Sequence, residues 1–307
     1  MSKNIVDRTH ESVSGYIIET VDGFDQNLDR LLTPEEMERN RTFDRFFGDR
    51  SLEKLDSRAQ VRVGIGAEWS RIDGFDVDLK FSGKVDLPRT EKRLKFVFNN
   101  LNEDENTLAE FKKKDSLSPA LQENDPGGSA SIQAALGEIF NIKFTADAGL
   151  DFNPEPVPTF KFTGRIPWRW GETDYRFSQR VFWASDDGFG EKTSLEVTRF
   201  LSEQFFIKSE TVGIWSETSE GVDLGQTLFM RYLLNKETSM GMILGAQAHT
   251  EPNFAMDLYL IRFPFRKPIY DHWIYLVVEP GIDFPDDHNW ELSPLISLKT
   301  EFYFGRM

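Results

Sequence analysis

The feature that most constrains the fold of this chain is an alternation of apolar and polar residues that recurs after residue 58. Between Ile296 and Phe304 every even-numbered residue is apolar except Thr300, while Lys299 and Glu301 lie at odd-numbered positions. Successive side chains of a β-strand point to opposite faces, so this stretch predicts a strand with one apolar and one charged face. A chain with many such strands is expected to be all-β.

The alternating stretches are also long. The first two cover residues 59–70 and 75–87 and are separated by a turn at Arg71–Gly74. About a dozen residues exceeds the usual length of strands in soluble sheets and suffices to cross a bilayer at a tilt. Further strands are expected near 94–98, 132–136, 140–150, 160–168, 174–184, 192–201, 204–215, 222–234, 239–248, 253–263, 271–284 and 293–304, although alternation is poor in 204–215 and 253–263. The sequence thus predicts about 14 strands, with about 12 as the main alternative.

The composition excludes several classes of function. A net charge of −15 argues against nucleic-acid binding, which requires clustered Lys and Arg. The absence of cysteine excludes disulfides, thiolate metal sites and cysteine nucleophiles. None of the four histidines lies in a His-Glu-x-x-His motif or beside a Gly-x-Ser-x-Gly motif. We therefore expect no catalytic residues, no metal site and no cofactor.

The end of the last strand, Phe302–Phe304, resembles the closing strand of bacterial outer-membrane β-barrel proteins, although three residues follow its last aromatic side chain. By pattern alone, this porin-like resemblance covers residues 58–307. It implies a transmembrane antiparallel up-and-down β-barrel in the bacterial outer membrane. It also implies contact with membrane lipid and lipopolysaccharide, and recognition of the C-terminal strand by the barrel-assembly machinery. Some barrels of this kind are lipid-modifying enzymes, which remains an alternative.

Residues 1–57 do not alternate and are expected to form a separate, partly helical segment. Thr33, Pro34 and Glu36 have the spacing of a helix start, with Thr as N-cap and Pro at the first helical position. This acidic segment would lie in the periplasm or plug the barrel, and it is a candidate docking site for a protein partner. Met1–Val13 has neither the basic nor the apolar region of a signal peptide.

The charged face of the predicted strands is the candidate functional surface. Its basic members are Lys161, Arg165, Arg169, Arg176 and Arg180. Its acidic members are Asp76, Asp78, Asp86, Asp147, Glu196, Glu210 and Glu301. In a barrel these sets would form a basic wall opposite acidic walls, and such charges set the ion selectivity of a pore. The alternative is a structural salt-bridge network that fills a closed lumen.

Aromatic residues gather at the predicted strand ends, as in the two aromatic girdles of membrane barrels. They are Trp69, Phe75, Trp168, Trp170, Trp215, Phe302 and Phe304. Together with the strand length and the short connections, they favour a barrel over a soluble β-sandwich, in which alternation also occurs.

The function that this interpretation predicts is passive passage of small polar or anionic solutes. The long connection at residues 100–128 would act as a lid or constriction. One alternative is a barrel that does not conduct and serves as a scaffold, with residues 1–57 docking a partner. A soluble β-sheet binding protein is a further alternative.

Overall fold

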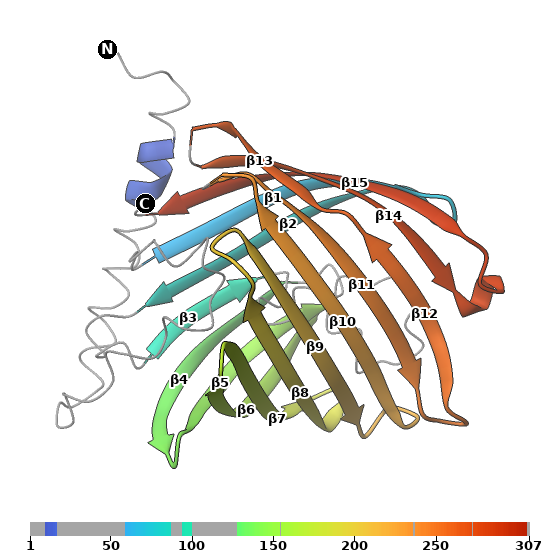
Figure 1. Cartoon of the computed structure of the whole chain (residues 1–307). Coiled ribbons are helices and arrows are strands. Elements are labelled where there is room, and N and C mark those ends of the chain that lie inside the picture. Colours follow the sequence, from blue (N-terminus) through green and yellow to red (C-terminus); the bar gives the residue numbers. More distant parts are fainter. Residues whose placement is uncertain are drawn as a thin grey trace.

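The structure is a computed structural model in which almost every described residue belongs to a strand or a turn (Figure 1). One short α-helix occupies residues 10–16. Among the described residues, no helix is long and apolar enough to span a membrane. The predicted helix start at Thr33–Glu36 lies outside the described residues, as does the loop 100–128 apart from Gly128. The described residues are 10–16, 59–86, 94–99, 128–153, 155–235, 237–271 and 273–305.

Fifteen strands form one sheet in which every pairing is antiparallel. In chain order they are β1 (Ala59–Ser70), β2 (Gly74–Asp86), β3 (Leu94–Asn99), β4 (Ser129–Ile139), β5 (Ile142–Asn153), β6 (Glu155–Trp170), β7 (Thr173–Ala184), β8 (Gly188–Phe200), β9 (Phe205–Ser216), β10 (Val222–Leu233), β11 (Ser239–His249), β12 (Ala255–Arg262), β13 (Phe265–Tyr270), β14 (Ile274–Pro285) and β15 (Ser293–Gly305). A short 3-10 helix, η4 (Asp286–His288), joins the last two strands.

The sheet closes on itself because its first strand pairs with its last. The ladder between β1 and β15 runs from Gln60 opposite Gly305 to Ser70 opposite Leu295. From β1 to β12 each strand pairs with the next one in the chain, and so do β13, β14 and β15, which gives an up-and-down barrel (Figure 1). We call the end of the barrel that contains Ala59 and Gly305 the terminal rim, and the opposite end the far rim.

The fifteen strands occupy fourteen positions in the wall, because β12 and β13 are two parts of one interrupted strand. Both pair with β14 in the same register, with Arg262 opposite Gly281 and Phe265 opposite Val278. The interruption falls at Pro264, which has no N–H to donate. The Pro264 carbonyl still accepts a hydrogen bond from the Gly241 N–H at 2.8 Å. The N–H of the adjacent Phe263 donates to the Pro280 carbonyl at 2.9 Å. The prediction of about 14 strands is confirmed and the alternative of 12 is wrong.

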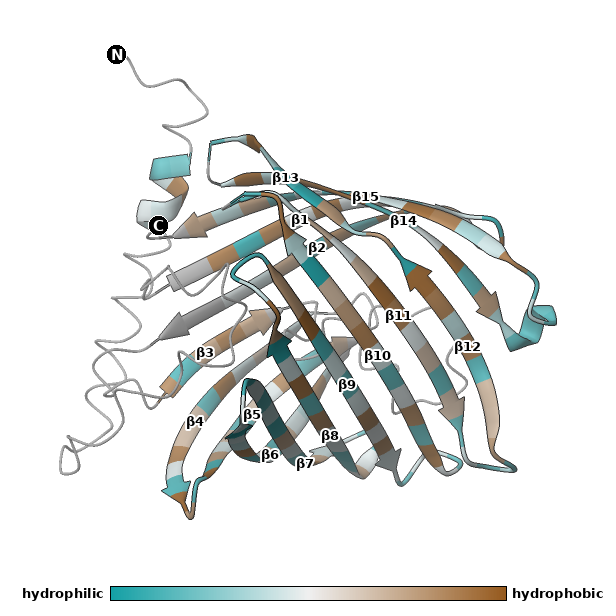
Figure 2. Cartoon of the chain, in the orientation of Figure 1, coloured by the Kyte–Doolittle hydropathy of each residue, from teal (hydrophilic) through white to brown (hydrophobic). Residues whose placement is uncertain are grey.

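The barrel is apolar outside and polar inside, and Figure 2 shows hydrophobic and hydrophilic residues following one another along the strands. Phe75, Leu79 and Phe160 are 70%, 61% and 61% exposed, although they are large apolar side chains. Thr163 and Ser297, on the opposite face of their strands, are each 1% exposed. A soluble β-sandwich hides its apolar face between two sheets, whereas this chain forms one closed sheet with its apolar face outward. The sandwich alternative is therefore wrong.

Candidate channel lining and membrane surface

The five basic residues predicted to line a pore lie on the inward faces of the adjacent strands β6 and β7. Thr163 faces Arg180 directly across the ladder, and the Arg180 Nε donates to the Thr163 hydroxyl at 3.3 Å. One strand further, Arg165 faces Lys143 on β5 and lies 3.5 Å from the Thr145 hydroxyl. Positive charge is thus concentrated over three adjacent strands.

Carboxylates on neighbouring strands pair with three of these basic residues. Arg169 binds Asp174 through two hydrogen bonds of 2.5 and 2.8 Å. The Lys161 ammonium lies 4.0 Å from an Asp151 oxygen. These pairs join neighbouring positions of the lining and do not reach across the lumen.

Glu196 on β8 joins two basic residues. It accepts a bond from Arg176 at 2.7 Å and lies 2.6 Å from the Lys208 ammonium. Glu210 lies directly opposite Glu196 on β9, so two carboxylates of the predicted acidic set meet there. Basic and acidic residues are therefore interleaved on β5–β9, where the sequence had suggested opposed walls.

Of the other acidic residues, Asp147 lies within the basic part of the lining, opposite Lys161, and the residues Asp76, Asp78 and Asp86 belong to β2. Asp147 on β5 accepts a bond from Gln133 at 2.7 Å, and Asp78 on β2 lies 3.3 Å from Lys80. The Asp76 carboxylate accepts a bond from the N–H of the next residue at 2.9 Å. The side chain of Asp86 lies outside the described part of the structure.

Glu301 belongs to a compact cluster on β13–β15. It lies 3.1 Å from the Arg266 Nε and accepts a bond from the Tyr303 hydroxyl at 2.9 Å. The Arg266 guanidinium also stacks over the Tyr275 ring, 3.5 Å from its centroid. Cation–π stacking and charge pairing together fix this arginine to the wall.

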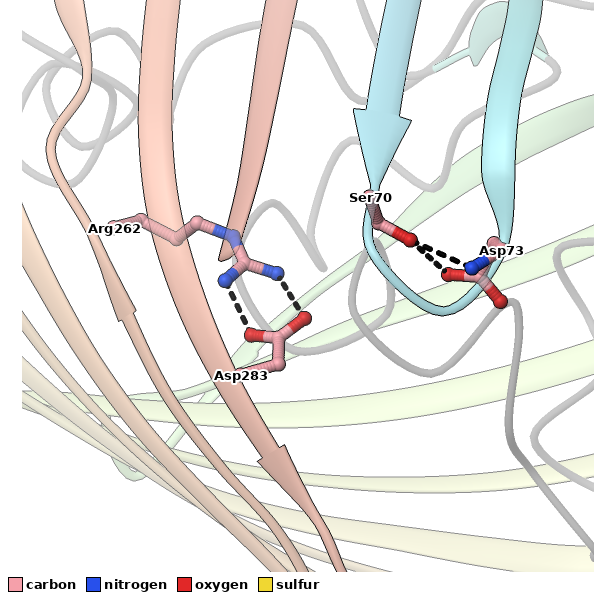
Figure 3. A network of polar contacts seen from close by, with 4 residues as sticks. All are labelled: Ser70, Asp73, Arg262 and Asp283. Atoms are coloured by element: carbon pink, nitrogen blue, oxygen red, sulfur yellow. Dashed lines mark hydrogen bonds and ion pairs between the residues drawn. The ribbon is translucent and has the colours of Figure 1, made fainter. Parts of the chain in front are cut away.

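An ion pair that the sequence did not suggest joins β12 and β14. Arg262, 5% exposed, donates from both terminal nitrogens to the two oxygens of Asp283 (Figure 3). In the same region the Ser70 hydroxyl donates a hydrogen bond of 2.8 Å to the Asp73 carboxylate, and this bond closes the β1–β2 turn. Arg262 follows Leu258 and Leu260 on the inward face of β12, and a charge at even spacing after two apolar residues was the available signal.

The lining is not polar throughout. Ile243, Leu258 and Leu260 form a buried cluster with Phe229 on the inward faces of β10–β12. This explains the poor alternation of 253–263, where apolar residues occupy both faces of the strand. Beside the cluster, buried polar atoms have no hydrogen-bond partner within the described structure: Asp223 Oδ2, Thr227 Oγ1 and Gln247 Nε2.

The predicted aromatic residues lie at both rims. At the far rim, Trp69 faces Phe75 across the ladder, and Trp215 ends β9. At the terminal rim, Trp168 stacks on Tyr175 with 5.1 Å between ring centroids. The other members of the set at the terminal rim are Trp170, Phe302 and Phe304.

The N-terminal helix is held against the terminal rim by its first residue. The His10 ring stacks on Trp273 with 4.3 Å between centroids and on Phe304 with 5.5 Å. Its Nε2 lies 2.9 Å from the backbone oxygen of Tyr303. The helix therefore contacts the last strand, which closes the barrel.

The described residues contain no group of three metal-ligating side chains.

No family model matches the sequence, and no curated protein matches it. Among solved structures, the fold is similar to an anion-selective porin from Comamonas acidovorans (TM-score 0.51, 8% identity, covering 80% of this chain and 98% of that one). It also matches the outer membrane channel DcaP of Acinetobacter baumannii (TM-score 0.48, 9% identity, 80% and 96% covered). A KdgM porin matches with a TM-score of 0.35 and 6% identity, over 78% of this chain and 98% of that one. The chain thus has the β-barrel fold of outer-membrane porins, as the pattern of its sequence predicted.

Proposed function

We propose that this protein is an outer-membrane channel for passive passage of small polar or anionic solutes. The observation that carries the proposal is the inside-out distribution of side chains in a closed barrel. Exposed residues such as Phe75 and Leu79 suit contact with membrane lipid and lipopolysaccharide, whereas Arg165 and Arg180 face inward. In a membrane barrel of this size, an inward polar face lines a lumen. Recognition of β15 by the barrel-assembly machinery belongs to the same proposal.

The preference for anions follows from the local charge of β5–β7. On the described inward positions of β5–β7, the basic residues Lys143, Lys161, Arg165, Arg169, Arg176 and Arg180 outnumber the acidic residues Asp147, Asp151 and Asp174. Charged rings select against ions of their own sign. A solute that passes this part of the lining therefore meets a positive surface.

Planar-bilayer recordings of the purified, heat-modifiable protein test the proposal. We expect single-channel conductance and, in a KCl gradient, a reversal potential that indicates anion preference. The double variant Arg165→Gln/Arg180→Gln should move this potential toward cation preference. Arg199→Gln is the matched control, because Arg199 is exposed near the terminal rim and lies 3.4 Å from Glu172. Absence of conductance from folded protein would refute the channel.

A non-conducting scaffold is the second candidate, and the docking of His10 on Trp273 favours it. A helix fixed at the rim would present the N-terminal segment to a protein partner. Pull-down with and without residues 1–57 separates the two functions. Loss of a captured partner from a barrel that never conducts would support the scaffold.

A further inference from the structure

The exterior of the barrel carries a belt of polar side chains across β7–β10. We call these residues the polar belt: Gln179, Glu191, Thr193, Ser209, Thr211 and Gln226. They point outward, as the ladder shows for Thr211, which lies between Leu195 and Gln226. Leu195 is itself an exposed apolar residue of the outer surface.

Hydrogen bonds within the polar belt hold its amides in place and leave part of their capacity unused. The Thr193 hydroxyl donates to Gln179 Oε1 at 2.6 Å, and Gln179 Nε2 donates to Glu191 at 3.4 Å. On the next two strands, the Thr211 hydroxyl donates to Gln226 Oε1 at 2.5 Å. Each hydroxyl oxygen retains acceptor lone pairs, and the Gln179 amide retains a second N–H. The belt therefore presents both donors and acceptors outward.

Two glycines lie in the same row of the ladder as two residues of the polar belt. Gly164, Gln179, Thr193 and Gly213 follow one another along a single row of the ladder. A side chain at Gly213 would meet only ordinary contacts with its neighbours, at 3.5 and 3.7 Å. Local packing thus does not require glycine there. Small residues at such positions allow another backbone to approach closely within a membrane.

The polar belt lies near the middle of its strands. Gln179 is the seventh of the 12 residues of β7, and Thr193 is the sixth of the 13 residues of β8. Thr211 is the seventh of the 12 residues of β9. At this depth in a bilayer, lipid chains offer no hydrogen-bond partner, so an outward polar group there is costly. A protein surface can supply the missing partners.

We propose that the polar belt is the contact surface for a second copy of this chain. All copies enter the membrane in the same direction, so a closed symmetric assembly has its axis along the membrane normal. Residues at equal depth then meet, and the belt of one copy meets the belt of another. Because the belt carries both donors and acceptors, it is complementary to itself.

The size of the face also fits. Four strands at about 4.8 Å spacing and an apolar band about 25 Å tall give a face of roughly 500 Å² per copy. Two such faces reach about 1,000 Å², the lower bound for a specific interface. The proposal rests on the membrane location proposed above and is independent of conduction.

Cysteine cross-linking tests the contact cleanly, because the native chain contains no cysteine. Full-length Thr211→Cys and Leu79→Cys proteins would be reconstituted in lipid vesicles and oxidised. Leu79 is the matched control, since it points outward from the middle of β2, distant from the belt along the wall. We expect a cross-linked dimer from Thr211→Cys and little from Leu79→Cys. Equal cross-linking, or none, would overturn the proposal.

A second variant tests the same surface by steric block. In Gly213→Leu the added Cβ would make only ordinary contacts within its own barrel. The leucine side chain would project into the proposed contact, so the Thr211→Cys cross-link should fall at least tenfold. Thr300→Leu, outward on β15, should leave it unchanged. Heat-modifiable migration verifies that each barrel has folded, and membrane fractionation tests the location separately. An unchanged cross-link in folded Gly213→Leu protein would refute the contact.

Discussion

The side chain of Arg262 on β12 lies across Gly281 on β14, at a position where an added methyl group would overlap the arginine Cδ. The two residues face each other in the ladder. Since Gly281 has no side chain, the arginine stem crosses its backbone and the guanidinium reaches both oxygens of Asp283. The glycine and the ion pair therefore form one structural unit.

Substitution of this glycine should loosen the ion pair. We expect Gly281→Ala to lower the free energy of unfolding by about 1–3 kcal/mol, because the new methyl group displaces a buried side chain. Urea titration in detergent micelles, followed by heat-modifiable migration, measures the loss. Gly64→Ala is the control: its added methyl group would make only ordinary contacts, at 3.6 Å and beyond, and should be close to neutral. Equal stability of both variants would contradict the coupling.

Loss of the carboxylate should cost more than loss of the whole pair. Asp283→Ala leaves the Arg262 charge buried without its bidentate partner, and we expect a loss of about 3 kcal/mol. Arg262→Met/Asp283→Ala removes both charges, so it should be more stable than Asp283→Ala alone. The same urea titration compares the free energies of unfolding of the single and the double variant. A double variant that is less stable than the single one would show that the charges contribute through other contacts.

Much of the fold could be predicted from the sequence because alternation records which face of a strand points out of the barrel. Alternation predicted the strands poorly where apolar residues also point into the barrel. Leu258 and Leu260 are apolar and point inward, so the strand at 253–263 alternates poorly. Pro264 removes one ladder donor without ending the strand, and the continuation through β13 was missed.

The candidate site was less predictable, because a pattern assigns a residue to a face and does not identify its partner. Arg165 and Arg180 were placed on the same face as expected. The pairing of Arg176 with Glu196 depends on ladder register, which alternation leaves open by steps of two residues. The docking of the N-terminal helix depends on the contact between His10 and Tyr303, which lie 293 positions apart in the sequence. A contact between such distant positions has no local signal in the sequence.

Removal of the Glu196 charge should change ion selectivity. Arg176 and Lys208 share this carboxylate, so Glu196→Gln leaves two cations in the lining with one anion fewer. We expect the reversal potential in a KCl gradient to shift toward stronger anion preference. Glu172→Gln removes the same charge at the terminal rim and should shift the potential much less. A larger shift from Glu172→Gln would place the selectivity outside this part of the lining.

Loss of the His10 ring should release the N-terminal helix and leave the barrel intact. The stacking of His10 on Trp273 and Phe304 is expected to contribute about 0.5–1.5 kcal/mol, because aromatic pairs contribute about this much beyond burial. His10→Ala should therefore accelerate amide hydrogen exchange at residues 11–16, measured by mass spectrometry. His288→Ala, at the far rim, is the control. The β1–β15 ladder does not involve His10, so its exchange should be unchanged. Acceleration of both regions would mean that the helix supports barrel closure and does not merely dock on the rim.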